Sequence, residues 1–235
     1  MAEQASEPEP ASGPRPSGPQ LPADAAATYP VLERHRVYTS GRVIAVDREV
    51  VELPNGGAPT RDVVRHPGAV GVIALDDTER VLLVQQYRHA PGRLLWEPPA
   101  GLLDVPGEAA LAAAQRELFE EAHYVARRWH VLVDLFTSPG MSDEAVRVYL
   151  AREVQPASAD RHVGQDEERD MPTSWVPIDD AVALVFAGAL HNPLAVTGIL
   201  AAARARELGY ANLRAVDAPW PDRVPQPPTG ADAPA

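Results

Sequence analysis

Short apolar runs separated by polar breaks dominate the first part of the chain, and this pattern predicts strands. Between residues 31 and 53, β-branched residues partly alternate with polar ones around a Ser-Gly break at 40–41, which predicts two strands. The "PNGG" stretch at 54–57 predicts a tight turn, and "TRDVVRH" after it predicts a third strand. We therefore expect a small antiparallel β domain at residues 30–66.

Two longer apolar runs follow, "AVGVIAL" at 69–75 and "RVLLVQQYRH" at 80–89, joined by the acidic turn "DDTE". Their β-rich content and the short turn predict a central hairpin that is buried on at least one side. The prolines and glycines of "LLWEPPAGLLDVPGE" predict a short strand and then irregular backbone. Further strands are expected at 129–136, 146–152 and 173–178.

A helix is predicted from residue 108 to 122, because apolar residues recur there at intervals of three and four. They are Leu111, Ala114, Leu118 and Ala122. Asp179 or Asp180 is expected to cap a second helix that ends near residue 186. Pro193 is expected to start a third that ends near 208. With no regular βαβ alternation, this order predicts an α/β sandwich with a mixed sheet rather than a doubly wound sheet.

Composition narrows the domain organisation and the class of protein. The 235 residues, 45% of them hydrophobic, suffice for one substantial domain, which we place at 67–210. Proline-rich segments at 1–29 and 211–235 are expected to be disordered tails. A net charge of −12 argues against a nucleic-acid partner. No apolar run is long enough for a membrane span, and the absence of cysteine fits a cytoplasmic protein.

The stretch "RELFEEAHY" at 116–124 concentrates acidic side chains on the predicted helix. Glu117 and Glu121 lie on one face, with Glu120 one step around it, and like charges at that spacing destabilise a helix by a few tenths of a kcal/mol. A solvated acidic face is the ordinary interpretation. However, the pair adjoins the apolar stripe, and the "PPAG" loop just upstream offers backbone carbonyls. Carboxylates and a carbonyl suit Mg²⁺, and Arg116 is expected to pair with a neighbouring carboxylate.

These residues resemble the Nudix box, in which a glycine, a glutamate and an Arg-Glu-apolar-x-Glu-Glu segment stand at fixed spacing. Gly101, Glu108 and the segment from Arg116 match it, with two departures. One extra residue separates Gly101 from Glu108. His123 replaces the glycine that ends the helix with a positive φ angle, a conformation that histidine can adopt at less cost than a β-branched residue.

The resemblance extends over about residues 35 to 205, through "VQQYRHAPGRLLWEPPAGLLD" and "SPGMSDEAVRVYLA", to the ADP-ribose pyrophosphatase branch of the Nudix hydrolases. It implies a Nudix-fold α/β/α sandwich behind the N-terminal β domain, and metal-dependent hydrolysis of ADP-ribose to AMP and ribose 5-phosphate. It also implies Mg²⁺ or Mn²⁺ as cofactor, and a homodimer joined through the N-terminal sheet. The alternatives are hydrolysis of another nucleoside diphosphate derivative, such as a sugar nucleotide or a dinucleotide polyphosphate, and a sensor that binds ADP-ribose without cleaving it.

Carried over position by position, the resemblance implies a specific set of site residues. The metal ligands would be the Ala100 carbonyl, Glu117, Glu121 and Glu168, the last from the acidic loop "GQDEERDM". The proton acceptor would be Glu168, Glu167 or Glu120. Substrate would be bound by Arg61, Arg88 and Leu102, although surface ion pairs are equally ordinary roles for the two arginines.

Overall fold

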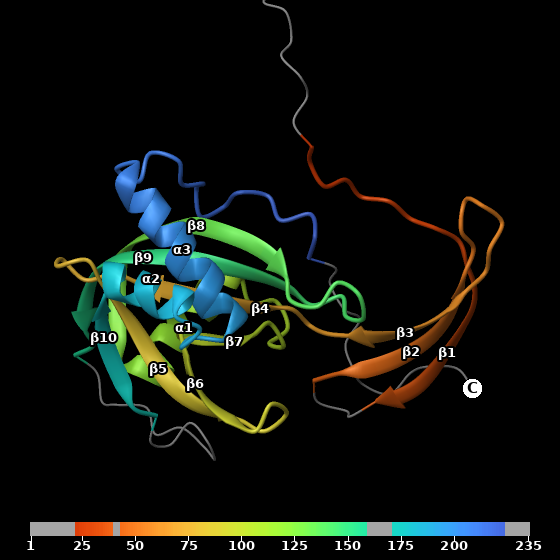
Figure 1. The fold of residues 1–235 in the computed structure, drawn as a ribbon, viewed down its shortest axis with the longest axis horizontal. Coiled ribbons are helices and arrows are strands. Elements are labelled where there is room, and N and C mark those ends of the chain that lie inside the picture. The colour runs from red at the N-terminus through yellow and green to blue at the C-terminus, as the bar shows by residue number, and fades with distance from the viewer. Residues whose placement is uncertain (1–21, 40–42, 159–170, 224–235) are drawn as a thin grey trace, which may run out of the picture.

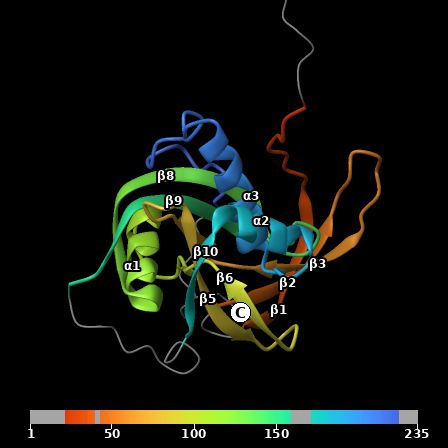
Figure 2. The ribbon, with the colours of Figure 1, turned by 60° about the vertical axis from the view of Figure 1, so that its left-hand side comes forward.

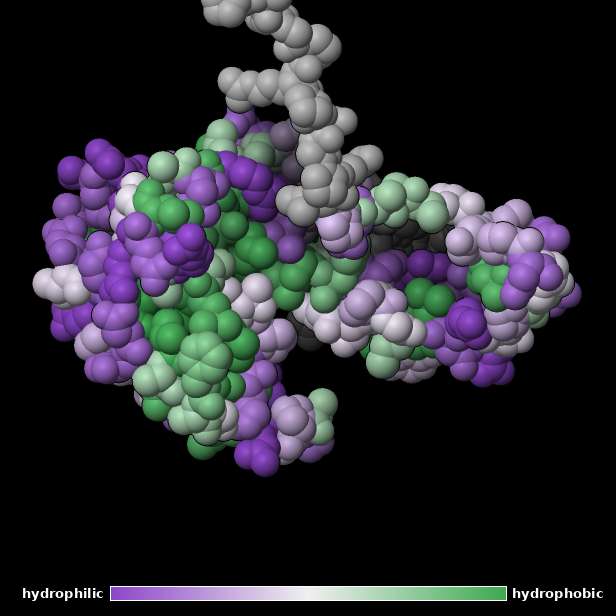
Figure 3. Space-filling model, turned by 45° about the horizontal axis from the view of Figure 1, so that its top comes forward, coloured by the Kyte–Doolittle hydropathy of each residue, from purple (hydrophilic) through white to green (hydrophobic). Residues whose placement is uncertain are grey.

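An antiparallel sheet at the N-terminus projects from the main body of the protein (Figure 1). The computed structural model describes residues 22–39, 43–158 and 171–223. The sheet has the order β1 (Val31–Thr39), β2 (Ala45–Val51), β3 (Thr60–Arg65), which confirms the predicted N-terminal sheet. In the space-filling view it forms a separate lobe with hydrophobic and hydrophilic residues side by side (Figure 3).

The sheet is attached to the main body through the end of β3. The Val64 N–H donates to the Met141 carbonyl at 2.8 Å, and the Asp143 N–H donates back to the Val64 carbonyl at 3.1 Å. The Asp143 carboxylate also accepts from the Arg65 guanidinium at 3.1 Å and from the His66 N–H at 2.8 Å. The loop between β8 and β9, which contains Met141 and Asp143, therefore fixes the position at which the chain enters the main domain.

The main body contains two further sheets. One has the order β10 (Thr173–Pro177), β5 (Arg80–Arg88), β6 (Arg93–Glu97). The other has the order β7 (Ala100–Leu102), β4 (Ala69–Ala74), β9 (Ala145–Pro156), β8 (Tyr124–Phe136), in which β4 and β9 are parallel. The strands at 124–136 and 145–156 extend further than the sequence pattern predicts, and the mixed α/β architecture is as expected.

The predicted central hairpin is wrong, because β4 and β5 belong to different sheets. A single bridge between Leu75 and Val81 joins the two runs. The physical reason is that both edges of β4 are already occupied. Along one edge it pairs in parallel with β9, from Ala69 to Ala74. Along the other it pairs with β7, and the Val72 N–H donates to the Pro99 carbonyl at 2.8 Å.

The helices are α1 (Ala110–Ala122), α2 (Ile178–Phe186) and α3 (Pro193–Glu207), close to the predicted ranges. Asn192 caps α3, since its side chain accepts from the N–H groups of the second and third residues of that helix. The predicted aspartate cap of α2 is wrong. Pro177 is at the cap position, and both aspartates lie in the first turn, where the helix dipole favours negative charge. Within the described residues, no helix is long and apolar enough to cross a membrane.

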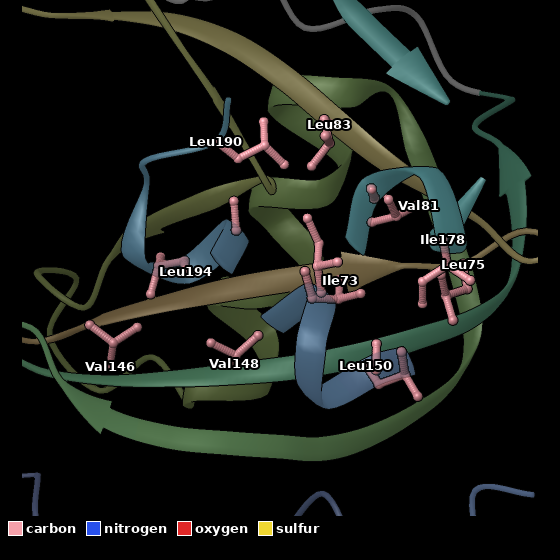
Figure 4. Close-up of a cluster of buried hydrophobic side chains, with 14 of the residues drawn as sticks. Ile73, Leu75, Val81, Leu83, Val146, Val148, Leu150, Ile178, Leu190 and Leu194 are labelled. Atoms are coloured by element: carbon pink, nitrogen blue, oxygen red, sulfur yellow. The ribbon is translucent and has the colours of Figure 1, made fainter. Parts of the chain in front are cut away.

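Alternate residues of β9 supply two cores, one on each face of the larger sheet. Val146, Val148 and Leu150 pack with Ile73 and α3 (Figure 4), whereas Tyr149 and its neighbour Ala151 pack with α1. In the rotated view, α1 and α3 lie on opposite sides of β8 and β9 (Figure 2). The sheet is therefore the central layer of an α/β/α sandwich, and α1 is held by a fully buried face.

Residues 211–223, which we call the C-terminal strap, cross the outer edge of β8. The Val131 N–H donates to the Arg214 carbonyl at 3.1 Å, so the strap occupies part of this edge. Beyond it, the buried guanidinium of Arg147 donates to the carbonyls of Ala218 and Pro219, at 2.8 and 3.0 Å. The ring of Trp220 lies 4.8 Å from the same guanidinium. Part of the proline-rich segment thus packs on the main domain.

Replacing Trp220 tests whether the strap stabilises the sheet. We expect Trp220→Ala to lower the free energy of unfolding by about 1 to 2 kcal/mol, because the buried guanidinium loses its cation–π partner. Urea unfolding measures the change. Phe186→Ala is the control, since that ring is 79% exposed and its loss is expected to leave stability unchanged. Equal stability of Trp220→Ala and the wild type would contradict a stabilising strap.

Candidate functional site

A cleft of about 1070 Å³ brings together most of the residues that the sequence singled out. It lies between α1, the loop from β6 to β7, the end of β5 and the segments before β4 and β9. Among the predicted site residues, those that line it are Arg88, Ala100, Leu102, Glu117, Glu120 and Glu121. Residues far apart in the sequence therefore share one solvent-accessible space, as a binding site requires.

Glu117 and Glu121 dock α1 against Ala100 and Gly101 of strand β7. Each glutamate is only 9% exposed, although carboxylates rarely occupy such positions without partners. The Ala100 N–H donates to Glu121 Oε2 at 2.9 Å. A Cβ atom at residue 101 would lie 1.9 Å from Glu117 Oε1, so only glycine leaves room for this carboxylate. The contact explains the glycine of the motif through close approach.

Arg116 connects the other carboxylates of the cluster. It donates to both oxygens of Glu108 at 3.0 Å, to Glu117 Oε1 at 2.7 Å and to Glu120 Oε2 at 3.0 Å. Hydrogen bonds from Arg116 lower the pKa of Glu108, and the bond to Glu108 is the largest of the effects that raise the pKa of Arg116. The expected pairing of Arg116 is confirmed, and its charge offsets part of the repulsion among the glutamates.

The donor set fits a hard divalent cation that also binds substrate oxygens. Two buried carboxylates adjoin Ala100 at the start of β7, and Mg²⁺ favours a few carboxylates together with water and phosphate. Among the described residues, no three His, Cys, Asp or Glu side chains are grouped closely enough to hold a metal alone. Glu167 and Glu168, predicted as the loop carboxylates, lie outside the described residues. Glu117, Glu121 and the Ala100 carbonyl would thus hold only part of the metal's coordination shell.

His123 ends α1 in the left-handed conformation that the family motif assigns to glycine. Its φ is 61° and its ψ is 38°, and its N–H donates to the Phe119 carbonyl at 2.9 Å. The His123 carbonyl accepts from the Ala157 N–H at 3.0 Å, which ties the helix end to the end of β9. Histidine therefore takes over the turn, and α1 ends directly after the acidic cluster.

The two predicted substrate arginines lie in different places. Arg88, at the end of β5, donates from two nitrogens to Glu97, at 2.9 and 2.6 Å. Arg61 is exposed on β3 and donates to the Thr60 carbonyl at 3.1 Å, and it does not line the cleft within one chain. The roles of both arginines in binding substrate remain predictions.

The wall of the cleft before β9 contains polar residues that were not predicted as site residues. His66 Nδ1 lies 3.6 Å from Glu144 Oε1 and accepts from the Gly68 N–H at 3.1 Å, and Thr137 donates to the other oxygen of Glu144. "SPGMSDE" marked this loop in the sequence, but nothing in the spacing linked it to His66. The association depends on the β3 attachment to the same loop.

Comparison with known proteins identifies the family to which this chain belongs. A family model described as the NUDIX domain matches residues 65–194. The chain is 47% identical to an ADP-ribose pyrophosphatase of Mycobacterium tuberculosis, over 78% of this chain and 87% of that protein. It is 41% identical to an ADP-ribose pyrophosphatase of Bacillus subtilis, over 62% and 77% of the two chains. A crystal structure titled as an ADP compounds hydrolase has the same fold, with a TM-score of 0.66, 20% identity, and coverage of 80% of this chain and 99% of that one.

Gly101→Ala tests the contact between β7 and α1. The added methyl group would overlap the Glu117 carboxylate, so one of the two must move. We expect affinity for Mn²⁺, titrated by electron paramagnetic resonance, to fall about 10-fold to 100-fold, the range for disturbing the support of a metal ligand. Gly140→Ala is the matched control, since a Cβ at that residue meets nothing within 4 Å. Unchanged Mn²⁺ affinity in Gly101→Ala would contradict this description.

Proposed function

Because this chain belongs to the Nudix family of hydrolases, we propose that it hydrolyses the pyrophosphate of ADP-ribose to AMP and ribose 5-phosphate. The observation that carries the proposal is the buried pair Glu117 and Glu121 beside Ala100 of β7, in one cleft with Arg88. Two relatives named ADP-ribose pyrophosphatase, each above 40% identity, support the choice of substrate.

Mg²⁺, or Mn²⁺ in its place, would be held by Glu117, Glu121, the Ala100 carbonyl and Glu168. A bound divalent cation supplies charge neutralisation at the pyrophosphate and lowers the pKa of the attacking water. Arg116 supports the arrangement, since its bond to Glu117 limits how far that carboxylate can turn. Because the cleft is rich in carboxylates, an anionic substrate is expected to bind there only when divalent cations are bound as well.

A carboxylate receives the proton when water attacks phosphorus and the bond to the bridging oxygen breaks. Glu168, Glu167 and Glu120 are the proposed acceptors, because a positioned carboxylate can take the proton of an attacking water. Of these, Glu120 has a described position, where it accepts from Arg116 at 3.0 Å. Arg88 would bind phosphate oxygens through its guanidinium, and Leu102 would bind substrate through its backbone.

We further propose a cytoplasmic homodimer joined through the N-terminal sheet. Strand β1 is exposed along its whole length, and it carries apolar side chains that are about half exposed, among them Leu32, Val37 and Tyr38. Such a surface suits burial against a second copy. Arg61, on the same sheet, would then bind substrate in the partner's cleft rather than in its own.

Incubation with Mg²⁺ and ADP-ribose tests the proposed activity. We expect release of AMP, no release in excess chelator, and a kcat at least about 100-fold lower for Glu121→Gln, because a ligand charge is lost. Glu207→Gln is the control, since it removes an equal charge from the exposed end of α3.

The same assay separates the alternatives when GDP-mannose, UDP-glucose and diadenosine polyphosphates are added as substrates. Faster cleavage of one of these would identify another nucleoside diphosphate hydrolase. ADP-ribose binding with no hydrolysis of any compound would identify a sensor. Wild-type turnover in Glu121→Gln would contradict the proposed metal site.

Light scattering tests the proposed dimer. We expect twice the mass of one chain, and a shift toward monomer in a Val37→Glu, Tyr38→Glu double variant, because the added charges oppose burial of the sheet. Leu184→Glu, at an exposed position of α2, is the control. A wild-type monomer at micromolar concentration would contradict the proposal.

A further inference from the structure

Glu97 is a buried carboxylate that the proposed reaction does not use, although it lines the same cleft as the α1 glutamates. It is 2% exposed, and its two oxygens accept from Nε and Nη2 of Arg88, at 2.9 and 2.6 Å. Such a two-point pair fixes the plane of a guanidinium, which a single hydrogen bond does not. We propose that Glu97 is a positioning residue that holds Arg88 in place for the pyrophosphate, an inference that rests on the proposed function.

The register of the β5–β6 hairpin gives this pair an unusual direction. Glu97 is opposite Val84, whereas Arg88 is opposite Arg93, so the two residues are separated by four positions, or about 13 Å, along the strands. Their side chains must therefore extend toward each other along one face of the hairpin. That face borders the cleft, because the intervening cross-strand pair, Gln86 and Leu95, lines it too. Glu97 thus draws the guanidinium back along the cleft, away from the hairpin turn.

Glu97 can hold Arg88 in one position because the residues that follow Glu97 are hydrogen-bonded to both β4 and α1. Two residues later, the Pro99 carbonyl accepts from β4 at 2.8 Å. Three residues later, the Ala100 N–H donates to Glu121 at 2.9 Å. The carboxylate that orients Arg88 and the carbonyl proposed to bind metal therefore belong to one short, tethered segment. This arrangement sets the separation between the cationic and the metal-binding parts of the cleft.

Arg88 and Glu97 are buried to different extents, and this difference determines which charge an anionic substrate meets. The Arg88 side chain is 44% exposed, whereas that of Glu97 is 3% exposed. With the pair intact, a pyrophosphate in the cleft meets the guanidinium. Without Arg88, the same pyrophosphate would face a buried carboxylate whose main counter-charge had been removed. Glu97 should therefore promote catalysis only while Arg88 is present, and oppose it otherwise.

A double-mutant cycle on the full-length protein tests this dependence, with kcat and KM measured for ADP-ribose and Mg²⁺. We expect Glu97→Gln to lower kcat/KM about 10-fold to 100-fold, the range found when a supporting partner of a site residue is lost. We expect Arg88→Ala to lower it further. Adding Glu97→Gln to Arg88→Ala should then restore part of the loss, because the unpaired charge is gone. Asp77→Asn, which removes the same charge from the exposed β4–β5 turn, should match the wild type.

Arg88→Lys provides a second route if Glu97→Gln fails to fold, as judged by its thermal melt. It keeps the positive charge and the buried carboxylate but lacks the planar fork, so it should lose a similar factor in kcat/KM. Wild-type kcat/KM in either Glu97→Gln or Arg88→Lys would overturn the role of Glu97, as would losses that multiply in the double variant. A wild-type protein that releases no AMP would instead overturn the proposed function.

Discussion

The docking of α1 against strand β7 determines the geometry of the cleft. The Glu117 carboxylate occupies the space that a side chain at residue 101 would need, and Glu121 accepts from the Ala100 N–H. These contacts place two carboxylates of one helix face beside one backbone segment. Arg116 offsets part of the resulting negative charge. Carboxylate and backbone carbonyl oxygens are the ligands that hard divalent cations prefer, so the arrangement suits a bound cation.

The rest of the fold keeps this contact in register. Strand β4 is paired along both edges, and it holds β7 and the preceding residue Pro99, whose carbonyl accepts from β4. The two cores of the larger sheet hold α1 and α3 against its opposite faces. At the far edge, the C-terminal strap occupies part of β8 and stacks Trp220 on the buried Arg147. The contact between α1 and residues 100–101 thus depends on the packing of α1, the larger sheet and α3 against one another.

Local patterns in the sequence predicted the local parts of this structure. The three-and-four spacing of apolar residues located α1, and the box motif selected the carboxylates that line the cleft. The pairing of strands was harder to predict from the sequence. Two adjacent β-rich runs look like a hairpin whether or not a distant strand, here β9, pairs with the edge of β4. Glu97 was missed for a similar reason. A single glutamate at the end of an apolar strand has no spacing signature, and only the register of the hairpin shows that it reaches Arg88. His123 was the opposite case, since its φ of 61° follows from its place in the motif.

Diffraction from crystals grown with Mn²⁺ would test the central claim most directly, because anomalous scattering locates the ion independently of any assay. Our account predicts a Mn²⁺ peak in contact with Glu117, Glu121 and the Ala100 carbonyl. A bound Mn²⁺ that contacts none of these three groups would contradict it.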